Sequence, residues 1–265
     1  MIQAHAIAGL PRCGSTLLSA LLSQNPTVQA GVTSPLISII GAVQGALGPK
    51  TEAHRLMGAD HRRACLRGAV DGYLSEFTDK SIVFDTNRMW PARLALAREL
   101  LGDVKVICCV RPVVEIVASF ERVFSENALE HSQIYTSNDY NTVFSRADTL
   151  MRPTGIIGSA LEALKEGLHG PLKEHILVVN YADFVRNPRS ILKQIYEFCS
   201  IPTFEHNFGE VEFSSKSLDD FLGLSGLHDV AKGVQEMARS INLPPEVVRR
   251  CESVEPWPSP PSASS

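Results

Sequence analysis

The segment from Gly9 to Thr16 has the residue types and the spacing of a phosphate-binding loop. It has two glycines five positions apart followed by two hydroxyl residues, in the order Gly9-Leu10-Pro11-Arg12-Cys13-Gly14-Ser15-Thr16. An apolar, strand-like segment (residues 5–9) precedes it, and a segment with helical leucine spacing (residues 15–24) follows it. Free N–H groups and the dipole at a helix start attract anions. The pattern therefore predicts a cradle for a phosphorylated nucleotide.

The side chains of this loop narrow the expected ligand. Ser15 and Thr16 supply hydroxyl donors, and Arg12 supplies a fixed positive charge with planar donors. Ser15 occupies the position at which a P-loop usually carries the lysine that bridges the outer phosphates of a nucleoside triphosphate. Hydrolysis of ATP or GTP is therefore disfavoured relative to binding of another phosphate. A strand-to-helix turn without a ligand is the simpler alternative.

A second pair of polar residues follows another apolar segment. Residues 105–110 are almost wholly apolar and end at Arg111, and Ser119 lies eight residues later in a predicted helix over residues 113–124. This spacing brings a charged clamp and a hydroxyl donor near one helix start. Either residue alone is unspecific, but together with the first loop they point to a ligand with more than one anionic group.

These residues resemble the nucleotide site of sulfotransferases that use 3′-phosphoadenosine 5′-phosphosulfate. The first loop is closest to the Pro-Arg-x-Gly-Ser/Thr-Thr version found in tyrosylprotein and many bacterial members, with Cys13 in place of the usual serine. The resemblance runs in order over residues 7–202. It implies that the 5′-phosphate is bound by Pro11, Arg12, Cys13, Gly14, Ser15 and Thr16, and that Arg111 and Ser119 bind the 3′-phosphate. A weaker match over residues 178–188 implies that Tyr181 lies beside the adenine, although a tyrosine packed at a strand end would look the same.

The resemblance implies in-line transfer of a sulfuryl group to a hydroxyl or amine of a small-molecule or carbohydrate acceptor, without a metal. Arg12 is then expected to stabilise the leaving group. The catalytic base is open, because Asn87 occupies the position of the histidine that acts as base in cytosolic members. Asp85 is the nearby candidate, but it could equally cap the turn or pair with Arg88, which could instead orient an acidic acceptor.

Two other functions remain open from the sequence alone. A P-loop kinase or NTPase would need an acidic Mg²⁺ partner after a strand, which Asp85 could imitate. A family member that binds nucleotide without turnover is the other alternative, because no base is evident. His228 lies where a C-terminal cofactor lid is expected, and Lys232 and Arg239 follow it and could reach a phosphate.

The elements that must position these residues alternate between apolar strands and helices. Strands are predicted over residues 5–9, 81–85, 105–110 and 176–179, and helices over residues 15–24, 92–101, 113–124 and 188–199. Continuous apolar strands between helices indicate an α/β fold, a P-loop-like doubly wound parallel sheet with helices on both faces. Residues 28–73 and 125–152 are less regular, and we expect them to be helical insertions that form an acceptor pocket and a lid.

Composition sets the remaining expectations. The 265 residues carry a net charge of −4, which disfavours a nucleic-acid partner. No run of 18 apolar residues and no signal-peptide pattern occurs, so we expect no membrane association. Six cysteines without metal-binding spacing are typical of buried thiols in a reducing compartment, which predicts a cytoplasmic protein. We expect one domain over residues 1–255 and a Pro/Ser-rich tail over residues 256–265.

Overall fold

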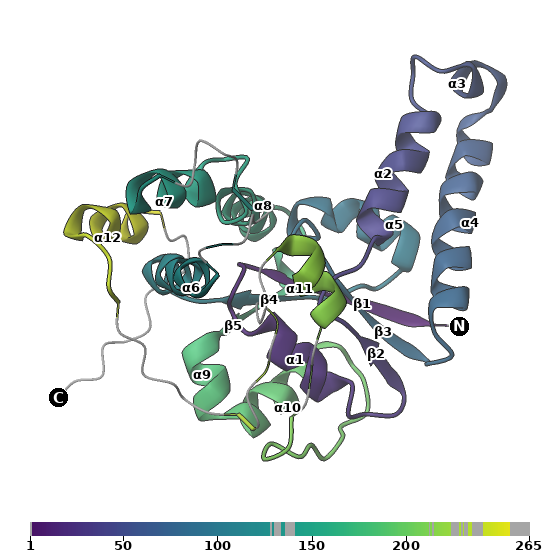
Figure 1. The fold of residues 1–265 in the computed structure, drawn as a ribbon. Coiled ribbons are helices and arrows are strands. Elements are labelled where there is room, and N and C mark those ends of the chain that lie inside the picture. Colours follow the sequence, from purple (N-terminus) through teal and green to yellow (C-terminus); the bar gives the residue numbers. More distant parts are fainter. Residues whose placement is uncertain are drawn as a thin grey trace.

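A five-stranded parallel sheet forms the centre of the protein in a computed structural model (Figure 1). The structure describes residues 2–127, 129, 134–135, 141–211, 213, 215–223, 228, 230, 233–234 and 241–254. All neighbouring strands run parallel, in the order β2-β3-β1-β4-β5. Their bounds are β1 Gln3–Gly9, β2 Val28–Ala30, β3 Ile82–Thr86, β4 Val106–Val110 and β5 Ile176–Asn180. The predicted α/β doubly wound sheet is confirmed.

The strand that the sequence did not predict is β2. It has only three residues, at the edge of the sheet, and it lies inside the insertion that was predicted to be helical. The four predicted strands form within two residues of their expected bounds, since each is mostly apolar; β1, β3 and β4 are buried almost throughout, and β5, at the sheet edge, is partly buried.

Helices cover both faces of the sheet. Figure 1 shows α1, α9 and α10 below the sheet, and α5, α6 and α8 above it. These helices are α1 Ser15–Leu22, α5 Leu94–Leu101, α6 Val113–Glu126, α8 Gly158–His169, α9 Tyr181–Arg186 and α10 Pro188–Phe198. Short 3-10 turns, η1 Pro91–Arg93 and η2 Lys173–His175, precede α5 and β5. All four predicted helices are present, and α5 starts two residues later than expected because the 3-10 turn takes its first residues.

The insertions add helices outside the sheet layers. The helices α2 Leu36–Ala46, α3 Glu52–Leu56 and α4 Ala59–Phe77 form an arm that projects from the body, seen at the upper right of Figure 1. The second insertion contributes α7 Val143–Met151. Near the C-terminal end lie α11 Lys216–Leu222 and α12 Pro245–Glu252, and α12 packs against α6.

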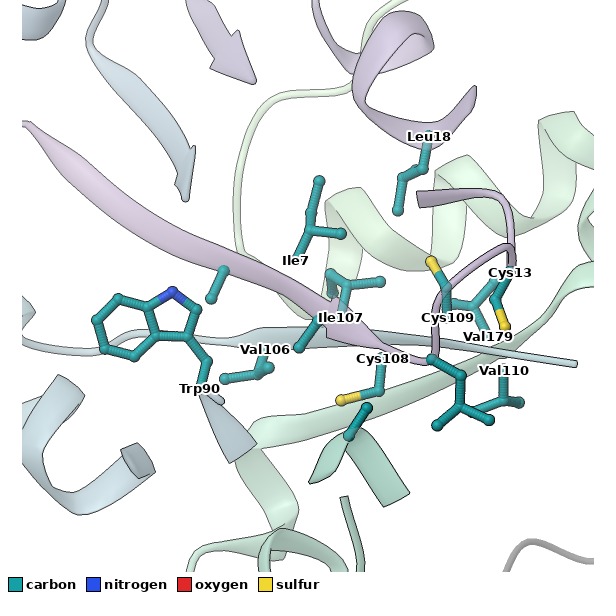
Figure 2. Close-up of a cluster of buried hydrophobic side chains, with 14 of the residues drawn as sticks. Ile7, Cys13, Leu18, Trp90, Val106, Ile107, Cys108, Cys109, Val110 and Val179 are labelled. Carbon is teal, nitrogen blue, oxygen red and sulfur yellow. The ribbon is translucent and has the colours of Figure 1, made fainter. Parts of the chain in front are cut away.

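The core lies between the sheet and its helices. Figure 2 draws part of it, with Ile7, Val106 and Ile107 from the central strands and Leu18 from α1. All six cysteines are free thiols, and only Cys65 is exposed. Burial raises the pKa of the Cys109 thiol to about 12, so this thiol stays protonated and packs as an apolar group.

Some expectations fall on residues that the structure does not describe. These are the tail over residues 256–265, Lys232 and Arg239. Within the described ranges, no helix combines the length and apolar character needed to cross a lipid bilayer.

Candidate functional site

The loop between β1 and α1 has a backbone that only glycine allows at two positions. Gly9 has φ +103°, and a Cβ there would lie 2.0 Å from the carbonyl oxygen of Cys109. The next amide, of Leu10, donates a 2.9 Å hydrogen bond to that same oxygen, which fixes the loop against β4. Gly14 has φ +85°, and a Cβ there would lie 2.6 Å from the ring of Tyr181. Both glycines of the predicted motif are therefore required by close approach of the backbone.

The start of α1 leaves backbone donors open. Gly14 is the N-cap residue and offers no side-chain acceptor. The N–H groups of Gly14, Ser15 and Thr16 have no hydrogen-bond acceptor among the described residues, and all three residues line a cavity. Such unpaired amides, aligned with the helix dipole, form an anion-binding site. The turn therefore has the open backbone amides at the helix start that the sequence predicted.

This cavity has a volume of about 470 Å³ and opens at the carboxyl ends of the central strands. The chain leaves β1 toward β2 and leaves β4 toward β5, in opposite directions, so β1 and β4 flank the switch point of the sheet, where such folds bind ligands. Among the described residues that line the cavity, three are arginines and none is aspartate or glutamate. The cavity is therefore suited to anionic ligands. Its arginines are Arg12, Arg88 and Arg111.

Arg111 is held rigidly at the cavity wall. It follows β4, and its side chain is only 5% exposed. Its Nε donates a 2.6 Å hydrogen bond to Glu115 on the first turn of α6, and one terminal nitrogen lies 2.5 Å from the same carboxylate oxygen. The guanidinium stacks 4.8 Å from the ring centroid of Tyr181, which also lines the cavity. The structure thus brings Arg111 and Tyr181 together, and the carboxylate of Glu115 is already paired with Arg111.

Arg12 has an unexpected partner. It adopts φ 61°, unusual for a residue with a side chain, and its Nε donates a 3.1 Å hydrogen bond to the hydroxyl of Ser119. Ser119 is buried and lies outside the cavity lining. Its contact therefore ties the loop to α6, whereas the sequence had suggested only a contact with a phosphate.

Cys13 faces the core instead of the cavity. It is buried, its thiol donates a 3.3 Å hydrogen bond to the carbonyl of Pro11, and Figure 2 shows it near Cys109. Burial raises the pKa of the Cys13 thiol well above its ordinary value, although the charge of Arg111 opposes this shift. Replacing the usual serine here therefore costs no donor at the cavity surface. Pro11 lines the cavity.

Asp85 does not line the cavity. It is buried, and its carboxylate accepts a 2.6 Å hydrogen bond from the indole N–H of Trp90. Burial raises its pKa, while hydrogen bonds from Ser34 and Trp90 oppose that shift. No ion pair joins Asp85 to Arg88, so that expectation is wrong. This position does not support the predicted role of Asp85 as base, because its side chain is buried and does not line the cavity.

A histidine that lines the cavity is paired with a buried aspartate. Nδ1 of His228 is 2.5 Å from Oδ1 of Asp219, and the His228 amide donates a 3.1 Å hydrogen bond to Oδ2. Asp219 lies in α11 with 2% of its side chain exposed, while His228 lines the cavity. A carboxylate beside Nδ1 favours the neutral tautomer that has its proton on Nδ1 and its lone pair on Nε2. The sequence pointed to His228 but not to Asp219, because the eight residues between them form no recognisable motif.

The fold is a parallel α/β sheet with open backbone amides at its switch point. A family model described as "Sulfotransferase family" matches residues 6–206, and the chain belongs to this family. No curated protein matches the chain in sequence.

Solved structures share the fold at low identity. The sulfotransferase domain of the Synechococcus PCC 7002 olefin synthase has 18% identity and a TM-score of 0.55, covering 98% of this chain and 96% of that one. The sulfotransferase domain from the curacin biosynthetic pathway has 16% identity and a TM-score of 0.55, covering 97% and 93%. A sulfotransferase from Alicyclobacillus acidocaldarius has 14% identity and a TM-score of 0.51, covering 84% and 91%. At these identities the likeness is one of fold.

Proposed function

We propose that this protein transfers a sulfuryl group from 3′-phosphoadenosine 5′-phosphosulfate to a hydroxyl or amine of a small-molecule or carbohydrate acceptor. One observation carries the proposal beyond family membership. The open amides at the start of α1 share one cavity with Arg12 and Arg111, which approach from different strands. A donor with phosphate groups at both ends of its ribose needs such separated anion-binding groups.

The donor is proposed to lie across β1, β4 and β5. Its 5′-phosphosulfate would take the amides and hydroxyls of Ser15 and Thr16, with Arg12 beside them. Its 3′-phosphate would contact Arg111, and the adenine would lie near the Tyr181 ring. Glu115 already balances part of the Arg111 charge and fixes its orientation. We therefore expect Arg111 to act mainly through hydrogen-bond donors held in a fixed orientation, because Glu115 offsets much of its positive charge.

For the base we propose His228 in place of Asp85. Nε2 of His228 takes the proton of the acceptor hydroxyl as the acceptor oxygen forms its bond to sulfur. The bond from sulfur to the bridging oxygen breaks, and 3′-phosphoadenosine 5′-phosphate leaves with the electron pair, stabilised by Arg12 and the loop amides. Asp219 holds the tautomer that leaves Nε2 open, and it stabilises the imidazolium that forms.

Calorimetric titration with 3′-phosphoadenosine 5′-phosphate, without metal, tests the donor site. Wild type is expected to bind the bisphosphate at micromolar concentration and to bind Mg-ATP more weakly. The variant Arg111→Ala is expected to lose at least tenfold in affinity, since two charge-assisted hydrogen bonds are removed. The matched control is Arg122→Ala, which removes an exposed arginine of α6, the helix that follows Arg111.

The other functions predict different results. Preference for Mg-ATP, or indifference to Arg111→Ala, would overturn the sulfotransferase proposal in favour of a kinase or NTPase. Tight binding of the bisphosphate without transfer or hydrolysis of the phosphosulfate donor would identify a binding protein without turnover, and would remove the role assigned to His228.

A further inference from the structure

Glu115 places a carboxylate beside the arginine that is proposed to bind the 3′-phosphate. It lies on the first turn of α6, four residues after Arg111. Its Oε2 accepts a 2.6 Å hydrogen bond from Nε of Arg111, and Nη2 of the same guanidinium lies 2.5 Å away. The helix dipole also stabilises a negative charge on the first turn of a helix. Two interactions therefore keep this carboxylate at Arg111.

The contacts of Arg111 limit how a ligand can reach it. The guanidinium has N–H donors along more than one edge, and Glu115 takes those along one of them. The ring of Tyr181 lies over the guanidinium, with its centroid 4.8 Å away. Arg111 lines the cavity, whereas Glu115 does not. An anion in the cavity therefore reaches Arg111 through the donors that Glu115 leaves open.

A 3′-phosphate bound to Arg111 would share this guanidinium with Glu115. Two anions on one guanidinium are close enough to repel each other, and a phosphate at neutral pH carries more than one negative charge. Solvent screens part of this repulsion, because 35% of the Glu115 side chain is exposed. The part that remains opposes binding of the phosphate.

A glutamine would separate the two effects that Glu115 has on Arg111. Its side chain has the same length, and its carbonyl oxygen can still accept a hydrogen bond from Nε, so the guanidinium keeps its orientation. Its charge is zero, so the repulsion of a neighbouring phosphate disappears. Orientation of Arg111 therefore requires only an acceptor at this position, and the negative charge of Glu115 has an effect of its own.

We propose that Glu115 limits the affinity of the protein for nucleotides that carry a 3′-phosphate. This inference rests on the proposed function, since it takes Arg111 as the partner of that phosphate. The donor and the product 3′-phosphoadenosine 5′-phosphate carry the same 3′-phosphate, so Glu115 weakens the binding of both. The weaker binding favours release of the product after transfer and its exchange for a new donor.

The test is calorimetric titration of wild type and Glu115→Gln with two nucleotides. These are 3′-phosphoadenosine 5′-phosphate and adenosine 5′-monophosphate, which lacks the 3′-phosphate. The variant is expected to bind the bisphosphate more tightly than wild type by about fivefold or more, with less than about a twofold change for the monophosphate. Added salt should reduce the gain, because it arises from charge.

The matched control is Glu126→Gln. It neutralises an exposed glutamate of α6 that pairs with Arg122 in the same i,i+4 arrangement, and neither residue lines the cavity. This control should leave the affinity for both nucleotides unchanged. A similar gain in Glu126→Gln would show that the net charge of the protein, and not the contact with Arg111, sets the affinity.

The outcomes separate this inference from the proposed function. Weaker or unchanged binding of the bisphosphate by Glu115→Gln overturns the inference, because Glu115 would then act only by orienting Arg111. An equal gain for both nucleotides also overturns it, since the effect would not involve the 3′-phosphate. If wild type itself does not prefer the bisphosphate to the monophosphate, Arg111 binds no 3′-phosphate, and the proposed donor site fails together with this inference.

Discussion

His5 is a buried residue of β1, the strand that precedes the loop, and we expect its protonation to lower the free energy of unfolding. It lies in β1 with 1% of its surface exposed, and its Nδ1 accepts a 3.2 Å hydrogen bond from the Lys105 amide at the start of β4. Its Nε2 is buried without a partner among the described residues. Protonation would place a hydrogen on Nδ1, break that bond and bury a charge. Desolvation accordingly lowers the pKa of His5 from its ordinary 6.5 to about 4.

The sign and size of the effect follow from this shift. The unfolded chain takes up a proton as the pH falls through about 6.5, but the folded chain resists until about pH 4. The contribution of His5 to the free energy of unfolding is therefore complete above pH 6.5 and is lost as the pH falls toward 4. The lowered pKa corresponds to about 3 kcal/mol, of which about 2 kcal/mol is lost between pH 7 and pH 4.5.

The perturbation is His5→Asn, which keeps an acceptor near the Nδ1 position and does not titrate. Urea unfolding at pH 7 and pH 4.5 gives the free energy of unfolding of each protein. The variant is expected to be less stable at pH 7, through lost ring packing against Phe84, but to lose about 2 kcal/mol less on acidification. Asp85 and His206 titrate in both proteins, so their contributions cancel. Equal losses in the two proteins would refute this account of His5.

Three further predictions concern the site and the core. Gly14→Ala should weaken binding of 3′-phosphoadenosine 5′-phosphate at least tenfold by calorimetry, whereas Gly102→Ala, which also has positive φ but open space around it, should leave binding unchanged; equal effects would contradict the steric argument. Asp219→Asn should lower kcat about a thousandfold with little change in KM for the donor, because the amide favours the wrong tautomer of His228, and a loss below tenfold would exclude the dyad as the base. In native protein Ellman's reagent should label one thiol quickly, that of Cys65, and two rapid thiols would contradict the burial of the others.

The sheet was predictable because most of its strands are buried. The segments that became β1, β3, β4 and β5 are mostly apolar, as expected for strands covered by helices. β2 was missed since a three-residue edge strand has too few side chains to show a pattern. Its existence depends on pairing with β3, which is a contact between distant parts of the chain.

The loop was predictable for a different reason. Its glycines and hydroxyl residues lie within eight consecutive positions, so their geometry follows from local backbone conformation. Asp85 and Ser119 show the limit of such reasoning. Each has the expected place in the chain, but neither side chain has the expected partner: Asp85 accepts from Trp90, five residues later, and Ser119 accepts from Arg12 in the distant loop.

The pair of His228 and Asp219 could not be predicted from the sequence. Neither His228 nor Asp219 is part of a spaced motif, and their pairing is a contact between side chains that the sequence alone does not place together. Asp219 differs from an ordinary carboxylate on a helix surface because its side chain is only 2% exposed. A single sequence does not show whether one acidic residue will be buried.

The strand order also has a consequence for how this protein can change. The groups proposed for the donor come from the ends of β1, β4 and β5, whereas the cavity residues on the other side, from Val32 to Met89, belong to one stretch of chain that includes the projecting arm. Substitutions confined to that stretch can remodel one half of the cavity while the nucleotide half keeps its geometry. The two halves of the cavity can therefore evolve separately, so that substitutions in one stretch of the chain can change the acceptor while the proposed donor site is retained.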